Sequence, residues 1–200
     1  MSHSLISGGR NRARYKRLWA WLLLCFIATL GIAPAQAKTH LAIRSAQATV
    51  EEEVYRLDTR LELKLPDDAR KAIEAGLTLR LAYQIEVTRV RRLLPDATVA
   101  ALEQRFELSY HALSQRYLVR NLNTGEQQDF GSFPAAIDRL SELRGLPVLD
   151  RTLLEEGPRY EGRIRAVLEM NTAPAGLGWL LFWTDNWSAT SDWYAWTLRH

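Results

Sequence analysis

The sequence predicts a mainly β fold, an antiparallel two-layer β-sandwich with two short helices and a Trp-rich C-terminal segment. Several long segments alternate apolar and polar residues with a period of two, the pattern of a strand with one dry and one wet face. Such half-solvated strands are typical of antiparallel sheets, whereas strands of parallel sheets are apolar on both faces. Before the C-terminal segment, only two short segments have the spacing of an amphipathic helix, so helices are minor elements.

Residues 1–37 predict an export signal. Five cations precede an apolar run over residues 18–33, and the small residues Ala35 and Ala37 then form a cleavage site before Lys38. The alternative is an uncleaved anchor, because this run of 16 residues approaches the minimum of ~17 for a membrane span. The chain is therefore expected in the periplasm, or anchored in the inner membrane and facing the periplasm.

Removal of the signal would leave one predicted domain, residues 38–200, that is slightly acidic and lacks cysteine. The whole chain has 26 Lys and Arg against 23 Asp and Glu, a net charge of +3, but five of the cations lie in the signal. The 21 cations that remain give a net charge of −2, which excludes nucleic-acid binding driven by bulk charge. Cys25, the one cysteine, lies in the apolar run of the signal, so the mature domain cannot form an internal disulfide.

The first part of the domain predicts two strands, a helix and a third strand. A short strand is expected over residues 41–43, and a longer one over residues 55–65, where apolar residues alternate with charged ones. A helix is expected over residues 69–75, where acidic residues open the first turn and Gly76 follows the end. The next strand, residues 77–88, again has one apolar and one polar face.

The middle of the domain predicts three further strands. A turn at residues 95–96 precedes two alternating segments, residues 102–110 and 117–120. A second turn at residues 123–125 contains a glycine that can take positive φ. Residues 127–130 are therefore expected to return as a hairpin partner.

The last part predicts a second helix and a final long strand. Residues 133–144 place their apolar side chains near one helix face, and Gly145 stands where that helix would end. Residues 146–157 are expected to form a connector. Residues 160–170 alternate as the last clear strand.

All five tryptophans of the mature domain lie in a C-terminal tail, residues 171–200. Trp179, Trp183 and Trp187 have the i, i+4, i+8 spacing of one helix face, whereas Trp196 belongs to an alternating run that suits a closing strand or an extended tail. Three interpretations of the tail stay open. It covers an open face of the sandwich as core, it docks another protein or the membrane interface, or it stacks on sugars of the cell wall.

Sequence motifs for catalysis, metal binding and nucleotide binding are absent from the chain. His111, one of three histidines in the mature domain, follows Tyr110 at the end of a predicted strand. A structural histidine bonded to backbone is favoured there over a catalytic base. The sequence therefore predicts no catalytic residue, metal ligand or cofactor, and it favours a non-catalytic protein while leaving catalysis open.

Three stretches together resemble one family. They read LELKL over residues 61–65, YHALSQRYLV over residues 110–119 and SDWYAW over residues 191–196, and the second stretch is the most specific. Together they resemble domain-of-unknown-function family 4390, a group of exported proteobacterial proteins, over most of the mature chain. The resemblance implies a bacterial envelope protein, and it carries no activity, substrate or catalytic residue.

The leading hypothesis is a non-catalytic periplasmic interaction domain whose partner is another envelope protein. Its expected contact surface combines the Trp-rich tail, including Trp193 and Trp196, with the strand end at Tyr110 and His111. One alternative is an envelope enzyme or glycan-binding protein acting on cell-wall material, in which His111 would work with a nearby carboxylate. Another is a membrane-anchored accessory domain, which differs only in keeping the signal. A nucleic-acid partner is not expected.

Overall fold

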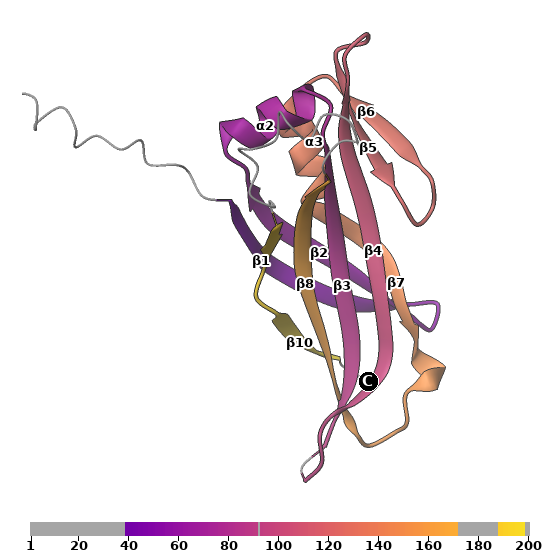
Figure 1. Ribbon diagram of the computed structural model, residues 1–200. Helices are drawn as coiled ribbons and strands as arrows, with labels where there is room; N and C mark the ends of the chain where they lie inside the picture. The colour runs from indigo at the N-terminus through magenta and orange to yellow at the C-terminus, as the bar shows by residue number, and fades with distance from the viewer. Residues whose placement is uncertain (1–38, 92, 172–187, 199–200) are drawn as a thin grey trace, which may run out of the picture. The chain divides into compact units, whose positions relative to one another are not determined.

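The computed structural model describes residues 39–91, 93–171 and 188–198, and these residues belong to one compact unit (Figure 1). Within that unit the strands form two antiparallel sheets, which confirms the predicted β-sandwich. Several predicted features lie outside the described residues: the export signal with Ala35, Ala37 and Lys38 at its cleavage site, and the tail residues Trp179, Trp183 and Trp187.

The smaller sheet has the strand order β1-β2-β7. Its strands are β1 (His40–Glu51), β2 (Val54–Lys64) and β7 (Glu142–Asp150). β1 is much longer than the predicted residues 41–43, because it pairs with β2 along the whole length of that strand. The two-residue turn between them consists of Glu52 and Glu53 at φ of 51° and 64°. Positive φ at both positions is what a type I′ hairpin turn requires, so this acidic run is part of a tight turn.

The larger sheet has the order β10-β8-β3-β4-β5-β6, and β9 also pairs with β8. Its strands are β3 (Thr78–Val90), β4 (Ala97–His111), β5 (Arg116–Asn121), β6 (Gln127–Phe130), β8 (Arg159–Asn171), β9 (Ser188–Thr190) and β10 (Tyr194–Leu198). Figure 1 shows the smaller sheet crossing behind the long strands β8, β3 and β4. The predicted strands of the middle segment and the hairpin partner β6 are confirmed.

The core lies between the inner faces of the two sheets, because alternate residues of each strand point toward the other sheet. β2 and β3 contribute most of its fully buried side chains: Tyr55, Leu57, Leu79, Leu81, Tyr83, Ile85 and Val87. The one polar atom on the Tyr83 side chain is satisfied, since its hydroxyl donates to the carbonyl of Leu140 (2.6 Å). The charged side chains of the described residues therefore remain outside the core, where binding surfaces must be sought.

Two helices close one end of the sandwich (Figure 1). α2 (Asp67–Glu74) buries Ala69 and Ile73, and Gly76 at φ 104° lets the chain turn into β3. The hydroxyl of Tyr117 donates to Glu74 (2.5 Å), which fastens α2 to the sheet. α3 (Phe133–Leu140) begins at Ser132, whose hydroxyl accepts a hydrogen bond from the N–H of Ala135 (3.4 Å).

The predicted helix over residues 133–144 is too long, and the predicted connector over residues 146–157 is wrong at its start. α3 ends at Leu140, and β7 follows at once as the third strand of the smaller sheet. The apolar residues that suggested a further helical turn are buried instead through strand pairing, since Leu143 lies opposite Thr59 of β2. A short 3-10 helix (Arg151–Leu153) then leads toward β8.

The sequence did not predict β7 as a strand because two of its residues are unusual in strands. Gly145 has φ 60°, a conformation that favours glycine, and it lies within an irregular part of the register with β2. Pro147 has no N–H to give to a ladder, and β7 tolerates it because the strand lies at the edge of the three-stranded sheet.

Candidate interaction surface

The described end of the chain continues the larger sheet along its edge beside β8. β9 pairs with residues 167–169 of β8 and β10 pairs with residues 160–164. Ser191 bridges the gap between them, because its N–H donates to the carbonyl of Ala166 (2.9 Å) and its Oγ accepts from the N–H of Ala166 (2.9 Å). The predicted closing strand is therefore confirmed, and β9 and β10 behave as one interrupted edge strand.

The interruption contains one extra residue. Between the last pair of β9 and the first pair of β10, two residues of β8 face three residues, 191–193. An extra residue of this kind is a β-bulge, which bends a strand and re-aims its side chains. Ser191 is buried, whereas Trp193 lies over the outward-facing residues of β8.

Trp193 lies against two arginines of β8. The guanidinium carbon of Arg163 is 4.7 Å from the ring centroid and that of Arg165 is 4.6 Å away. Both distances are within the range of a cation–π interaction. These arginines point to the outer face together because they are two positions apart on one strand. We call Trp193, Arg163, Arg165 and Glu86 the Trp193 cluster.

Both arginines are held from the neighbouring strand β3. Arg163 donates to Glu86 through Nε (2.9 Å) and Nη2 (2.5 Å), and its register partner on β3 is Glu86. Arg165 donates through Nε to Oε1 of Gln84 (2.8 Å), also its register partner. Gln84 carries no charge, and among the residues that the structure describes no ion pair involves Arg165. The cluster thus has one positive charge in excess of its carboxylate.

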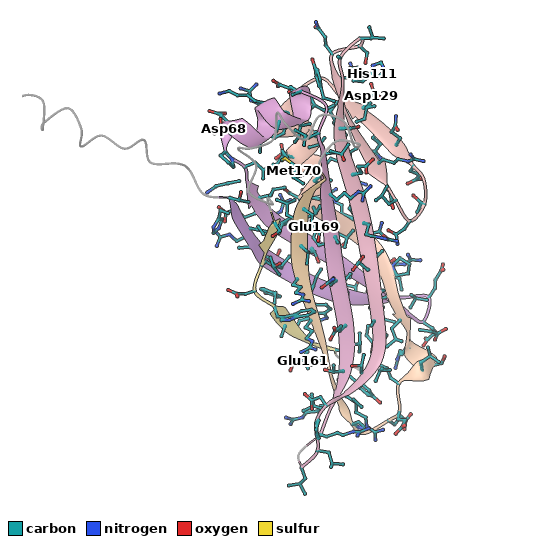
Figure 2. All side chains as sticks on the ribbon, viewed as in Figure 1. Asp68, His111, Asp129, Glu161, Glu169 and Met170 are labelled. Atoms are coloured by element: carbon teal, nitrogen blue, oxygen red, sulfur yellow. The ribbon has the colours of Figure 1, made fainter. Side chains whose placement is uncertain are left out.

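The row of polar side chains continues across the sheet. Gln84 donates through Nε2 to Glu103 on β4 (3.0 Å), and Arg80 donates to Glu107 on the same strand (3.1 Å). Figure 2 labels Glu161 and Glu169 near the two ends of β8, and both are exposed. These hydrogen bonds between neighbouring strands make the cluster part of an ordered polar face.

A shallow hollow of about 220 Å³ lies beside the Trp193 cluster. Its floor contains the small side chain of Ala82 on β3 and that of Val167 on β8, which are register partners. Longer polar residues form its rim: Arg80, Gln84, Glu103, Arg105 and Glu169. Small side chains at the bottom and longer polar ones around them leave a depression into which a side chain of a partner can fit.

Trp196 points the other way, so it does not share a surface with Trp193. It packs on the core from β10, opposite Gly162 of β8. A Cβ added to Gly162 would overlap the Trp196 ring, so only glycine leaves room for this contact. Trp196 thus has the position of a core residue, whereas Trp193 lies on the outer face of the sheet.

The predicted partner region at Tyr110 and His111 lies far from the Trp193 cluster. Arg165, Gln84 and Glu103 form one cross-strand row, and Tyr110 is seven residues further along β4 than Glu103. At roughly 3.3 Å per residue this separation is about 23 Å. Trp193 and Trp196, the tryptophans of the tail that the structure describes, therefore do not share a surface with Tyr110. Tyr110 packs on Tyr117, with ring centroids 5.0 Å apart.

His111 makes local contacts within the β4–β5 turn. Its Nδ1 lies 2.8 Å from Oγ of Ser114 and accepts from the N–H of Ser114 (3.3 Å). Figure 2 labels Asp129 near the same end of the sheet, where it forms an ion pair with Arg116, the register partner of His111. These contacts suit a side chain that stabilises a turn.

No group of three or more metal-ligand side chains occurs in the part of the chain that the structure describes. Over those same residues, no helix is both long and apolar enough to cross a membrane.

The alternation of residues 160–170 directs Arg163 and Arg165 to one strand face, away from the apolar residues, but it does not connect them with Trp193. Two cations at i and i+2 on a strand were the available signal, and their aromatic partner is almost 30 residues away in the chain. Only the pairing of β8 with the edge strand, including the extra residue, joins them.

The fold and this surface define an antiparallel β-sandwich domain with an ordered polar face and an aromatic residue at its edge. Over residues 38–197 the chain matches the family model described as domain of unknown function DUF4390. The chain belongs to this family, as its sequence resemblance suggested. No match was found among curated proteins or among solved structures.

Proposed function

We propose that this chain is an exported, non-catalytic interaction domain of the bacterial cell envelope, and that it binds a protein partner through the Trp193 cluster. The predicted signal over residues 1–37 supports export. The observation that carries the binding proposal is a half-buried tryptophan placed on the outer face of a sheet rather than in the core, beside two arginines. Tryptophan and arginine are the residues most enriched at the energetic centres of protein interfaces.

The geometry favours a protein over a glycan as the partner. A sugar stacks on aromatic surface, and the guanidinium groups of Arg163 and Arg165, which lie over the Trp193 ring, reduce the surface left for stacking. The excess charge on Arg165 and the adjacent hollow instead suit a partner with a carboxylate and a small apolar side chain.

Intact mass and cell fractionation test the export proposal. In a Gram-negative host, we expect a chain that begins at Lys38 in the soluble osmotic-shock fraction. A full-length mass in an alkaline-washed membrane pellet would instead support the anchored alternative. A full-length mass in the cytoplasmic fraction would contradict export.

Photo-crosslinking in intact cells of the native species tests the binding proposal. A photoreactive residue at Ala195, which is exposed and next to Arg163 in register across the β8–β10 pair, should give a discrete crosslinked protein. The matched control is Leu113, which is 95% exposed in the distant β4–β5 turn and should give no such product. The same product from both positions, or none from Ala195, would count against the proposal.

A further inference from the structure

The edge of β2 is only partly covered by β7. On one side, β1 pairs with β2 up to Lys64. On the other side, the ladder with β7 ends at the pair of Arg60 with Glu142, because the chain before β7 belongs to α3. Among the described strands, residues 61–64 of β2 therefore have a neighbour on one side only.

The backbone groups of Leu63 point toward the uncovered side. The N–H of Leu61 points to the β7 side, because it donates to the carbonyl of Ser141 (2.8 Å). Residues two apart on a strand direct their N–H and C=O groups to the same side. The N–H and C=O of Leu63 thus point toward the β7 side of β2, at a position that the ladder between β2 and β7 does not reach.

A groove of about 710 Å³ runs along this edge. Leu61 and Leu63 form part of its wall, and Phe130 of β6 and Ile137 of α3 contribute apolar surface. Its charged lining consists of the cations Arg44, Arg60, Lys64 and Arg139 and the carboxylates Glu62, Asp138 and Glu142.

The groove has more positive than negative charge, although the mature domain has a net charge of −2. Glu62 is shared between Arg44 and Lys64. Glu142 is shared between Arg60 and Arg144, and the latter adds one more cation at the rim. Two carboxylates therefore accept four cations, which leaves positive charge beside the open edge.

We propose that this groove binds an extended, acidic segment of a partner protein, which adds to β2 as a strand. An added strand would hydrogen-bond to the backbone of Leu63 and place alternate side chains on opposite faces. One set would face the apolar surface of Phe130 and Ile137, and the other would face Arg60 and Lys64. The segment is thus one in which apolar and acidic residues alternate.

This inference is independent of the Trp193 cluster. The groove lies along β2 of the smaller sheet, α3 and Phe130 of β6, whereas the Trp193 cluster lies on the outer face of the larger sheet at β3, β8 and the edge strand. Loss of one site would leave the other intact, so the two proposals can fail separately.

Titration of the isotope-labelled protein with a probe peptide tests the inference by NMR. The probe is acetyl-Glu-Val-Glu-Val-Glu-Val-amide, and its lysine counterpart, acetyl-Lys-Val-Lys-Val-Lys-Val-amide, is the charge control. We expect the acidic probe to shift the amide signals of Leu63 and Leu65 most and to slow hydrogen exchange at Leu63. The lysine peptide should not bind, and added salt should lower the affinity of the protein for the acidic probe.

Paired variants test the role of charge. The double variant Arg60→Gln, Lys64→Gln should lower the affinity for the acidic probe about tenfold, since both cations face the bound probe. Their side chains are 63% and 71% exposed, so the fold should tolerate the change, which a thermal melt checks. Lys71→Gln with Arg151→Gln is the matched control, at 68% and 40% exposure outside both the groove and the hollow, and should leave affinity within about twofold.

Three results would overturn the inference. They are an absence of shifts along residues 61–65, shifts centred on another strand edge, and equal binding of the acidic and lysine peptides.

Discussion

At the scale of single residues, the two described tryptophans face opposite sides of one sheet. Trp196 lies on the inner side against Gly162, and Trp193 lies on the outer side against Arg163 and Arg165. The extra residue before β10 determines which of the two side chains faces inward, because side chains after it alternate strictly between the two faces of the sheet. The two residues should therefore respond differently to truncation.

Trp196→Ala is expected to lower the free energy of unfolding by about 2–4 kcal/mol, somewhat below the range for a fully buried tryptophan because Trp196 keeps some exposure. Trp196→Phe should cost much less. The indole N–H of Trp196 is buried and, among the described residues, has no hydrogen-bond partner, so its removal offsets part of the lost packing. Urea unfolding of both variants checks this, and equal losses would contradict it.

Gly162→Ala is expected to destabilise the wild-type domain because the added Cβ would overlap the Trp196 ring. In a Trp196→Ala background the same change should be nearly neutral. The double-mutant cycle should therefore give a coupling of at least about 1 kcal/mol between the two positions. Additive effects would show that Gly162 is required for another reason.

At the scale of elements, long strands with local hairpin partners were predictable and β7 was not. β2 alternates without a break, so its apolar face is fixed by sequence alone. In β7, Gly145 and Pro147 break the alternation, and the apolar residues Ile137, Leu140 and Leu143 extend a helical pattern past the true end of α3. Pairing with β2, about 90 residues earlier, makes this segment a strand, and no local pattern contains that information.

Ser191→Ala tests how the edge strand is joined to the sheet. The variant removes the hydroxyl that accepts from the N–H of Ala166, and the site is buried. A buried N–H left without a partner costs about 1–3 kcal/mol. We expect that loss in unfolding experiments, with faster hydrogen exchange at Ala166. Unchanged exchange at Ala166 would contradict this role of Ser191.

The attachment of α2 should depend on pH at both ends of the scale. The hydrogen bond from Tyr117, together with Arg70, lowers the pKa of Glu74 below 4.5, so its stabilisation should be lost as pH falls through the lowered value. Burial and the same hydrogen bond raise the pKa of Tyr117 to about 12, so stability should fall as pH rises from 10 toward 12.

Tyr117→Phe removes the hydrogen bond and the titrating hydroxyl together. Its free energy of unfolding should therefore change less with pH than that of the wild type, both below pH 4.5 and above pH 10. Unfolding curves across both ranges measure the difference, and parallel profiles for the two proteins would contradict the assignment.

At the scale of the whole molecule, the two sheets contribute a shared core and two separate outer surfaces. The larger sheet carries the Trp193 cluster, and the smaller sheet with α3 carries the basic groove. The sequence predicted the sandwich because alternation reveals which face of each strand is dry. It did not reveal that Trp193 lies far from Tyr110 and His111, because that separation depends on strand order and register.

Truncation of Trp193 separates a role in binding from a role in folding. The most direct measurement is the yield of the crosslink from Ala195 in cells that carry Trp193→Ala, together with the unfolding free energy of the purified variant. We expect loss of the crosslinked product with stability within about 1 kcal/mol of the wild type, since Trp193 lies outside the core. An undiminished crosslink, or a loss of stability of the size expected for Trp196→Ala, would contradict it.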